Sequence, residues 1–313
     1  MALPTGAFTG TSDISNLVKA AYDQYVRMAL RSIPVMRSLA DVKPVQQAMP
    51  GSSVVFSIYS DLNAVTSTLT ETLDVSSVAL GNPSQVTVTL NEYGSAVTTT
   101  KKLNLTSFND VDAALADIIA YNAADSIDSV VATVLTGGSN VIYGGNATTT
   151  NTIDSADTIS VADIRNAVTE LRTNKALPRL GELYAAYLHP RQAADLRAES
   201  GTGGFQDIVK YTDNVSKTII PGSVGVIEGA FVVETPRVPF AANTNSPAVN
   251  VYKAVVAGRE ALAEAMGQDI NTVIGPEIDA LRRFRTIGWY YFGGFARLRE
   301  AALYRIETSA SAG

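Results

Sequence analysis

Two strand-like segments in the first hundred residues constrain the fold most strongly. Residues 84–91 alternate strictly between apolar and polar side chains, which is the period-two pattern of a half-buried strand. Residues 53–60 show a similar pattern, and a Gly-Asn-Pro turn at 81–83 precedes the second segment. The apolar face of the two segments comprises Val54, Phe56, Ile58, Val86, Val88 and Leu90. An isolated two-stranded hairpin is only marginally stable in water, so this face needs a partner.

That partner is either the rest of the chain or a second copy of it, and the charge distribution bears on the choice. Residues 44–100 contain no lysine or arginine, whereas Glu71 and Asp74 lie in the stretch between the two strands. Residues 103–164 also lack basic residues. The only tight basic cluster is formed by Arg282, Arg283 and Arg285.

Such segregated charge suits surfaces that meet other surfaces, although folding could instead pair these charges within one subunit. We therefore predict inter-subunit contacts by the apolar face of the hairpin, by Glu71 and Asp74 between its strands, and by the basic cluster.

The remaining pattern indicates a mixed α+β chain. Residues 11–39 have the spacing of an amphipathic helix interrupted near Pro34. Residues 107–135 carry the strongest apolar stripe and predict a helix about 40 Å long. Residues 182–275 mix strands and short helices in a separate lobe, and the aromatic-rich residues 286–307 predict long strands that return to the long helix.

Catalytic and metal chemistry find little support in the sequence. The chain has no cysteine and one histidine, which excludes thiol nucleophiles and Cys/His zinc sites. We expect this residue, His189, to cap the helix that begins at Pro190 or to lie on its surface. Asp125 and Asp128 are neighbours on the long helix, and we interpret them as a solvated or interface face rather than a glycosidase pair. We predict no catalytic residue, no metal and no cofactor, with an α+β hydrolase as the alternative from a different class.

Nucleic-acid and membrane partners are also disfavoured. The net charge of −6 argues against a simple nucleic-acid-binding protein, because such proteins carry basic patches that release counterions from phosphates. No continuous apolar run of 18 residues is present, and residues 1–10 lack the pattern of a signal peptide. We therefore expect no membrane partner and synthesis in a cytoplasm.

The order of these elements, together with several short motifs, resembles the major capsid proteins of tailed phages. These proteins have the Hong Kong 97-like (Johnson) fold, which encapsulin shells share. The motifs are Thr11-Ser12-Asp13-Ile14, Glu92-Tyr93-Gly94-Ser95-Ala96-Val97, Leu188-His189-Pro190-Arg191-Gln192, Ala194-Asp195-Leu196-Arg197, Gly222-Ser223-Val224-Gly225, Tyr252-Lys253-Ala254, Gly258-Arg259-Glu260-Ala261, Gly288-Trp289 and Arg297-Leu298-Arg299. Each motif is weak alone, and their order along residues 11–308 is the stronger signal.

The resemblance implies four regions. Residues 1–43 would be an N-terminal arm and residues 44–102 an extended loop, the β-hairpin arm, lying on an adjacent subunit. Residues 103–179 and 276–313 would form a peripheral domain with the long helix as its spine. Residues 180–275 would form an axial domain.

The same resemblance implies self-assembly into hexamers and pentamers that close an icosahedral head shell around double-stranded DNA. DNA contact would be weak and non-specific, and portal, scaffolding or decoration proteins would be further partners. The protein would belong to the virion after assembly in the host cytoplasm. An encapsulin-like nanocompartment is the closest alternative. Some relatives crosslink through a lysine in the extended loop, so the absence of lysine there predicts a non-covalent shell. An arm helix starting near residue 12 predicts a separate scaffolding protein or none.

Overall fold

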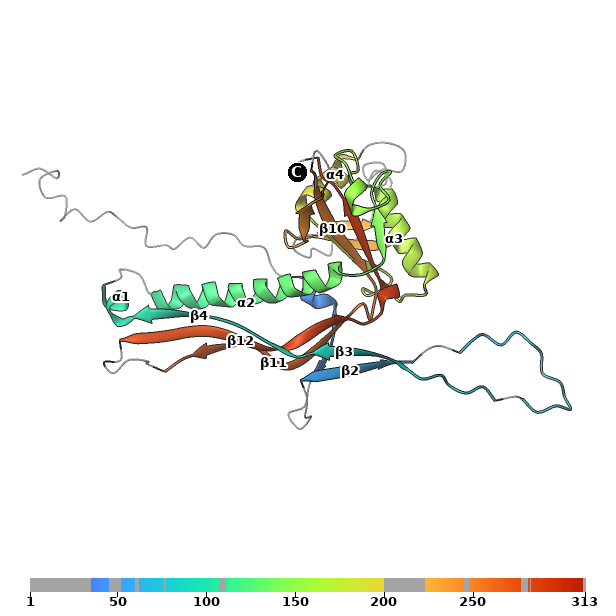
Figure 1. Ribbon diagram of the computed structural model, residues 1–313, viewed down its shortest axis with the longest axis horizontal. Helices are drawn as coiled ribbons and strands as arrows, with labels where there is room; N and C mark the ends of the chain where they lie inside the picture. The colour runs from blue at the N-terminus through green and yellow to red at the C-terminus, as the bar shows by residue number, and fades with distance from the viewer. Residues whose placement is uncertain are drawn as a thin grey trace, which may run out of the picture.

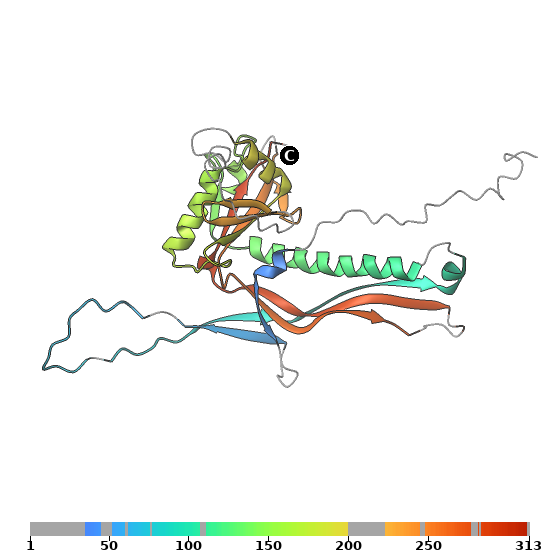
Figure 2. The same cartoon turned by 180° about the vertical axis from the view of Figure 1, so that it is seen from behind.

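Two β-sheets and one long helix organise the part of the chain that the structure describes. The computed structural model describes residues 35–44, 52–59, 62–75, 77–106, 111–199, 223–244, 248–276, 281 and 283–311. They form an elongated body, a head at one end of the body, and a loop that projects beyond both (Figure 1). The view from behind shows the same projection (Figure 2).

The body is built on a four-stranded sheet in the order β1-β11-β12-β4. Its strands are β1 (Ala40–Pro44), β11 (Leu262–Ile274), β12 (Phe284–Arg297) and β4 (Asn91–Thr100). β1 runs parallel to β11, and the other neighbours are antiparallel. Tyr290 of β12 lies opposite Gly94 of β4, where a Cβ atom would stand 2.8 Å from the Trp289 carbonyl oxygen. A side chain at position 94 would therefore force the two strands apart.

The long helix α2 (Val111–Thr136) lies along this sheet, after the short helix α1 (Lys101–Thr106) (Figure 1). Its apolar stripe packs on alternate residues of β12, because a 3.6-residue helical period and a two-residue strand period each present one face. The packed side chains are Ile119, Ala123, Ile127, Ile287, Trp289 and Tyr291. Asn122 accepts a 2.9 Å hydrogen bond from the Trp289 indole. The predicted long helix is confirmed over residues 111–135, and residues 107–110 lie outside the described part.

Composition alone would allow Leu115–Thr136 of α2 to cross a membrane. Its packing gives a different reason for the apolar character. The face that carries Ile119, Ala123 and Ile127 is buried against β12, and the following turns bury Val131 and Leu135 in the core between body and head. We therefore regard α2 as a core helix.

The head contains a seven-stranded sheet with helices α3 (Val161–Thr173) and α4 (Pro190–Ala198). Its main path runs β5 (Val141–Tyr143), β13 (Leu303–Thr308), β10 (Asn250–Ala257), β6 (Tyr184–Leu188), β8 (Ala230–Glu234) and β7 (Ser223–Ile227). The short β9 (Phe240–Ala242) also pairs with β10. A capping box begins α3: Ser160 Oγ accepts from the Asp163 amide, and the Asp163 carboxylate accepts from the Ser160 amide.

The strand pairing departs from two expectations. β13 joins the head sheet beside β10 instead of returning to the long helix, so the prediction for residues 286–307 is right for β12 and wrong for β13. β11 pairs with β12 in the body, although its residues were expected in the 182–275 lobe. The chain turns at Gly258–Ala261 from the head strand β10 into the body strand β11, so the sheets do not divide at residue 275. Sequence alternation predicts strands without stating their partners.

The first described residues, 35–44, form a segment that we call the N-terminal clasp. Residues Met36–Leu39 form a 3-10 helix and continue into β1, while the predicted helical residues 11–34 lie outside the described part. Asp128 of α2 is buried and accepts from the backbone amides of Val35, Met36 and Arg37 at 3.3, 2.7 and 3.0 Å. Burial raises the pKa of this carboxyl, and the three amide hydrogen bonds oppose that rise.

The clasp is also bound to the body by a buried ion pair. The Arg37 guanidinium donates to both carboxylate oxygens of Glu264 on β11, with a shortest distance of 2.7 Å. Glu264 has no exposed side-chain surface and also accepts from the Tyr291 hydroxyl at 2.9 Å. Burial acts to lower the pKa of Arg37, but hydrogen bonds to Glu264 and Asp269 hold it above its ordinary value. The clasp thus connects α2, β11 and β12.

On the head side, the clasp is held by a second arginine. Arg179 donates to the Asp41 carboxylate at 2.6 Å and to the carbonyl oxygens of Ser38 and Ala40 at 3.1 Å. The other oxygen of Asp41 accepts from the Glu260 amide at 3.0 Å. These contacts fix the clasp to the head and to the turn that leads from β10 into β11.

Candidate assembly interface

The projecting loop begins with a two-stranded stem, β2 (Ser53–Ile58) and β3 (Ser84–Thr89). The strands are antiparallel, with Val54 opposite Val88 and Phe56 opposite Val86. The predicted hairpin is therefore confirmed, and its six apolar residues share one face as expected. Cross-strand pairs of this kind stabilise a hairpin when the face they form is covered.

The apolar face of the stem is buried by residues of the same chain. Val54, Val88 and Leu90 are at most 7% exposed and pack with Ala263 and Ala265 of β11. Phe56 packs against the edge of this cluster, and Ile58 and Val86 are half-buried. The expectation that Val54, Val88 and Leu90 contact a neighbouring subunit is therefore corrected, because their surface is already buried on β11. A charge introduced at Val88 would disturb this core instead of testing assembly.

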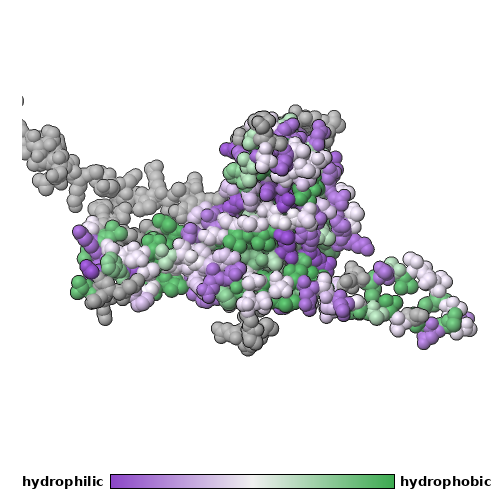
Figure 3. Space-filling model, viewed as in Figure 1, coloured by the Kyte–Doolittle hydropathy of each residue, from purple (hydrophilic) through white to green (hydrophobic). Residues whose placement is uncertain are grey.

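Beyond the stem, the described loop residues 62–75 and 77–83 leave the body and make no apolar core of their own. Figure 3 shows hydrophobic side chains scattered along this projection. Eight large apolar side chains from Tyr59 onward are 60–80% exposed: Tyr59, Leu62, Val65, Leu69, Leu73, Val75, Val78 and Leu80. So many exposed large apolar side chains in one segment indicate a contact with another molecule. We call residues 62–83 the distal loop.

The distal loop also carries the two acidic residues singled out in the sequence. Glu71 and Asp74 lie in a turn at the outer end of the loop, where the Leu73 amide donates to the Thr70 carbonyl at 3.2 Å. Asp74 accepts from the Val75 amide at 2.8 Å, and both acids are exposed. The apolar residues around them lack a strand or helix period, so periodicity could not identify them. Their frequency in a Thr- and Ser-rich stretch was the only available signal.

The basic cluster lies at the opposite end of the molecule. Arg282 is outside the described residues. β12 begins at Phe284, opposite Thr100 at the end of β4 and next to α1, far from the loop (Figure 1). Arg283 lies 5.4 Å from the Phe284 ring centroid, and the Arg285 carbonyl accepts from Thr99. One chain therefore does not bring Arg283 and Arg285 to Glu71 and Asp74.

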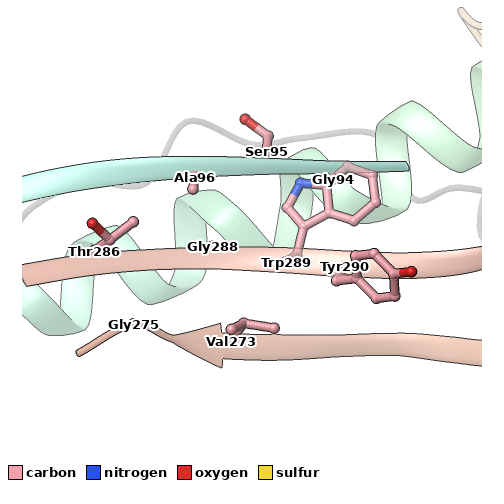
Figure 4. A pocket seen from close by; sticks show the side chains of 9 residues that line it. All are labelled: Gly94, Ser95, Ala96, Val273, Gly275, Thr286, Gly288, Trp289 and Tyr290. Carbon is pink, nitrogen blue, oxygen red and sulfur yellow. The ribbon is translucent and has the colours of Figure 1, made fainter. Parts of the chain in front are cut away.

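A groove crosses the outer face of the body sheet near that end (Figure 4). It has a volume of about 370 Å³ and is lined by Gly94, Ser95, Ala96, Val273, Gly275, Thr286, Gly288, Trp289 and Tyr290. Small residues form its floor, and a Cβ atom at Gly288 would lie 2.7 Å from that of Ala96. The lining contains no carboxylate, histidine, lysine or arginine. It can receive apolar surface, but it offers no acid and base for general acid–base chemistry.

The residues weighed for catalysis have structural partners. Asp125 binds the Arg237 guanidinium at 2.5 Å, while Asp128 holds the clasp and lies 3.9 Å from the same guanidinium. The expectation that both acids form a solvated or interface face is therefore wrong for the buried Asp128. His189 caps α4 as predicted, with Nδ1 accepting from the Arg191 amide at 3.2 Å, and burial lowers its pKa. None of the three side chains meets another in a cleft.

Comparison with known proteins agrees with an assembly role. A family model described as phage capsid protein matches residues 9–311. The fold is similar to the capsid of Ralstonia phage GP4, with a TM-score of 0.78, 15% identity and coverage of 98% of each chain. It is also similar to the capsid of cyanophage Pam1, with a TM-score of 0.72, 13% identity, and coverage of 96% of this chain and 98% of that chain. A third similar structure is the acid-stable capsid of Helicobacter pylori bacteriophage KHP30, with a TM-score of 0.72, 14% identity, and coverage of 98% of this chain and 100% of that chain. A search of curated proteins finds no match.

Proposed function

The chain belongs to the phage capsid protein family and is a major capsid protein of the phage head shell, and from this premise we propose that its distal loop holds the next subunit. It is a structural subunit that assembles with copies of itself in the virion capsid, and it has the Hong Kong 97-like fold. The hydrolase alternative and the encapsulin-like alternative are both set aside by the family assignment.

The observation that carries the loop proposal is its exposed apolar surface. A large apolar side chain contributes about 1.5–3 kcal/mol when it moves from water to a fully buried site. The distal loop of a single chain gains little of this stabilisation, since its seven large apolar residues are 60–80% exposed. Burial on an adjacent subunit would recover part of it, and a closed lattice repeats the contact many times. Subunits would form hexamers and pentamers in this way.

Leu69→Ser/Leu73→Ser tests the loop proposal. The two leucines are 74% and 72% exposed, so the subunit should fold with an unchanged midpoint of thermal unfolding. Shell assembly should weaken, with the subunit concentration required for assembly rising roughly tenfold or more. Leu105→Ser is the matched control, because Leu105 is 77% exposed but lies on α1 at the other end. Light scattering against concentration gives the readout, and equal behaviour of the two variants would contradict the proposal.

The shell should be held without covalent bonds between subunits. The distal loop contains no lysine, so it cannot supply the amine for an amide crosslink. The capsid protein of mature particles boiled in denaturant should therefore migrate as a single band at the mass of one subunit. A ladder of linked subunits on that gel would overturn this prediction.

The cargo and the remaining partners follow from the family. We propose that the shell belongs to a tailed phage and encloses double-stranded DNA through weak, non-specific contacts, in keeping with the net charge of −6. Assembly in the host cytoplasm and contacts with portal, scaffolding or decoration proteins belong to the same proposal. Nucleic acid extracted from purified particles tests the cargo: nuclease-protected double-stranded DNA supports it, and its absence from mature particles contradicts it.

The four-region division is part of this proposal in modified form. The long helix α2 with β12 would be the peripheral domain, and the head sheet with α3 and α4 the axial domain, so that β5, α3 and β13 belong to the head and β11 to the body. The predicted inter-subunit contacts of the half-buried Phe56, Ile58 and Val86 and of Glu71, Asp74, Arg282, Arg283 and Arg285 stay predictions.

A further inference from the structure

Two adjoining pockets lie at the base of the projecting loop, where the stem meets the head. The first has a volume of about 290 Å³, and Lys175, Leu177, Arg259, Glu260, Arg299 and Ala301 are among the residues that line it. The second has a volume of about 320 Å³ and includes Ile58, Tyr59 and Ser84 of the stem. Both are lined by Arg299 and Ala301, so they lie side by side, and together we call them the basal pocket.

The head side of the basal pocket carries an excess of positive charge. Lys175, Arg259 and Arg299 come from three separate turns, and all three side chains are exposed. The pocket also contains two acids, and each is paired: Glu260 with Arg299 at 2.8 Å, and Glu300 with Arg297 at 2.9 Å. Among the described residues, no acidic group lies within ion-pair distance of Lys175 or Arg259. Two cations therefore face the pocket without a carboxylate to balance them.

The three turns are fixed to one another by backbone hydrogen bonds. The Arg259 amide donates to the Leu177 carbonyl at 2.7 Å, and the Arg299 amide donates to the Glu260 carbonyl at 3.0 Å. Lys175 and Glu260 have φ angles of 55° and 59°, a left-handed conformation that is uncommon outside glycine. The surrounding structure thus fixes the backbone positions from which the cationic side chains extend. The pocket is therefore largely formed before anything binds.

We infer that the tip of the distal loop of one subunit docks in the basal pocket of the next. The tip presents Glu71 and Asp74 between the exposed Leu69, Leu73 and Val75, and the distal loop has no cation. The pocket presents two unbalanced cations beside exposed Leu177 and Ala301. The acidic residues of the tip lie between apolar residues, and the basic residues of the pocket lie beside apolar residues, so the two surfaces are complementary in charge and in hydrophobicity. This inference rests on the proposed role of the loop and names the surface that receives it.

Geometry makes this contact intermolecular. Twelve residues separate Tyr59 at the pocket from Glu71 at the tip, and twelve extended residues span at most about 40 Å. Figure 1 shows the loop running away from its own stem, so its outer end lies far from the pocket of its own subunit. Each subunit therefore presents the tip on one side and the pocket on another. Such head-to-tail contacts are heterologous and close into rings when the rotation fits.

The glycine-floored groove on the body sheet is the competing receptor within the chain. It can bury leucine side chains, but its lining has no cation to face Glu71 or Asp74. Docking in the groove would remove water from these carboxylates without giving them a partner, which costs free energy. Docking in the basal pocket avoids this cost, because cations are present there. Charge therefore favours the basal pocket over the groove.

Crosslinking distinguishes the two receptors, and the natural chain has no cysteine to confuse the result. Thr72→Cys/Ala301→Cys places one thiol at the tip and one in the basal pocket, whereas Thr72→Cys/Ser95→Cys places the second thiol in the groove. Assembled particles are treated with a short bismaleimide and run on a reducing denaturing gel, with the three single variants as controls. We expect a ladder of linked subunits from the pocket pair and only single subunits or isolated dimers from the others.

The other outcomes are equally informative. A ladder from the groove pair and none from the pocket pair would overturn the basal pocket while leaving the loop as the clamp. Intact shells without a ladder from either pair would overturn both this inference and the proposed role of the loop.

A charge exchange tests the electrostatic part. Glu71→Lys/Asp74→Lys should raise the subunit concentration needed for assembly roughly threefold to twentyfold, since each exposed ion pair contributes modestly. Lys175→Glu/Arg259→Glu should do the same, and the four substitutions together should restore assembly to within about twofold. No gain from the combination would contradict the inference. Normal shells from Lys175→Glu/Arg259→Glu with reduced DNA content would overturn it too, because the pocket would then bind phosphate.

Discussion

A subunit without the distal loop should fold normally and fail to form shells. Ile58 lies directly opposite Ser84 in the stem, so an Asn-Gly turn replacing residues 59–83 can close the hairpin with a favourable two-residue connection. Shortening the connection lowers the entropy cost of closing it, by about 2 kcal/mol for this change in length. The midpoint of thermal unfolding should therefore stay the same or rise, while sedimentation shows subunits or small oligomers only.

The stem makes this variant a fair test. Val54, Val88 and Leu90 keep their contacts with β11 when the loop is removed, so the body loses no core. Circular dichroism should match that of the full chain apart from the lost irregular residues. Closed shells of normal size from the shortened chain would show that the loop is dispensable for assembly.

The second large effect is expected at the buried ion pair of the N-terminal clasp. Glu264→Ala would leave the Arg37 guanidinium partly buried without the carboxylate that it now binds at 2.7 Å. Removing one member of a buried pair costs about 3–5 kcal/mol when the remaining charge is uncompensated, and because the exposed Asp269 stays 2.9 Å from the Arg37 guanidinium, the lower end of this range is expected here. We expect the free energy of unfolding to fall by about that amount, measured by denaturant titration of unassembled subunits.

Two further variants separate pairing from packing. Arg37→Met/Glu264→Met replaces both charges with apolar side chains and should cost much less than Glu264→Ala, because no charge is then stranded. Glu300→Gln alters the pair with Arg297, in which both side chains are about one-third exposed, and should cost about 1 kcal/mol or less. Equal losses for the single and double variants at positions 37 and 264 would show that volume, not charge pairing, determines stability there.

The sequence predicted the local secondary structure better than it predicted which strands pair with one another. Strict alternation identified the two stem strands, and the apolar stripe identified α2, because one-dimensional periods report which face is buried. The Ser160 capping box and the His189 cap were also readable, since each involves residues within three positions. These features depend on neighbours in sequence, which a single chain displays directly.

Long-range partners explain what the sequence did not predict. β11 and β13 exchanged their expected sheets because alternation says nothing of which strand pairs with which. The apolar stem face was assigned to a neighbouring subunit, yet Ala263 and Ala265 cover it from more than 170 positions away. Lys175 and Arg259 are 84 positions apart and gave no sign of a common pocket. Asp128 looked like one of a pair of surface acids because its backbone partners lie 91 to 93 positions earlier.

The placement of exposed and buried surface connects the fold to assembly. The clasp fixes the head, the long helix and the body sheet together, and the stem is anchored on that sheet. A rigid base of this kind lets a loop reach outward and still present its tip at a defined position. The apolar residues that remain exposed in one chain are concentrated where a second chain would meet them.

An electron cryomicroscopy reconstruction of assembled particles tests this role of the loop most directly. We expect a closed icosahedral shell in which density for residues 62–83 leaves its own stem and lies on the adjacent subunit, with the tip beside Lys175 and Arg259. Density that folds the loop back onto its own subunit, or leaves its apolar residues in solvent throughout the closed shell, would contradict it.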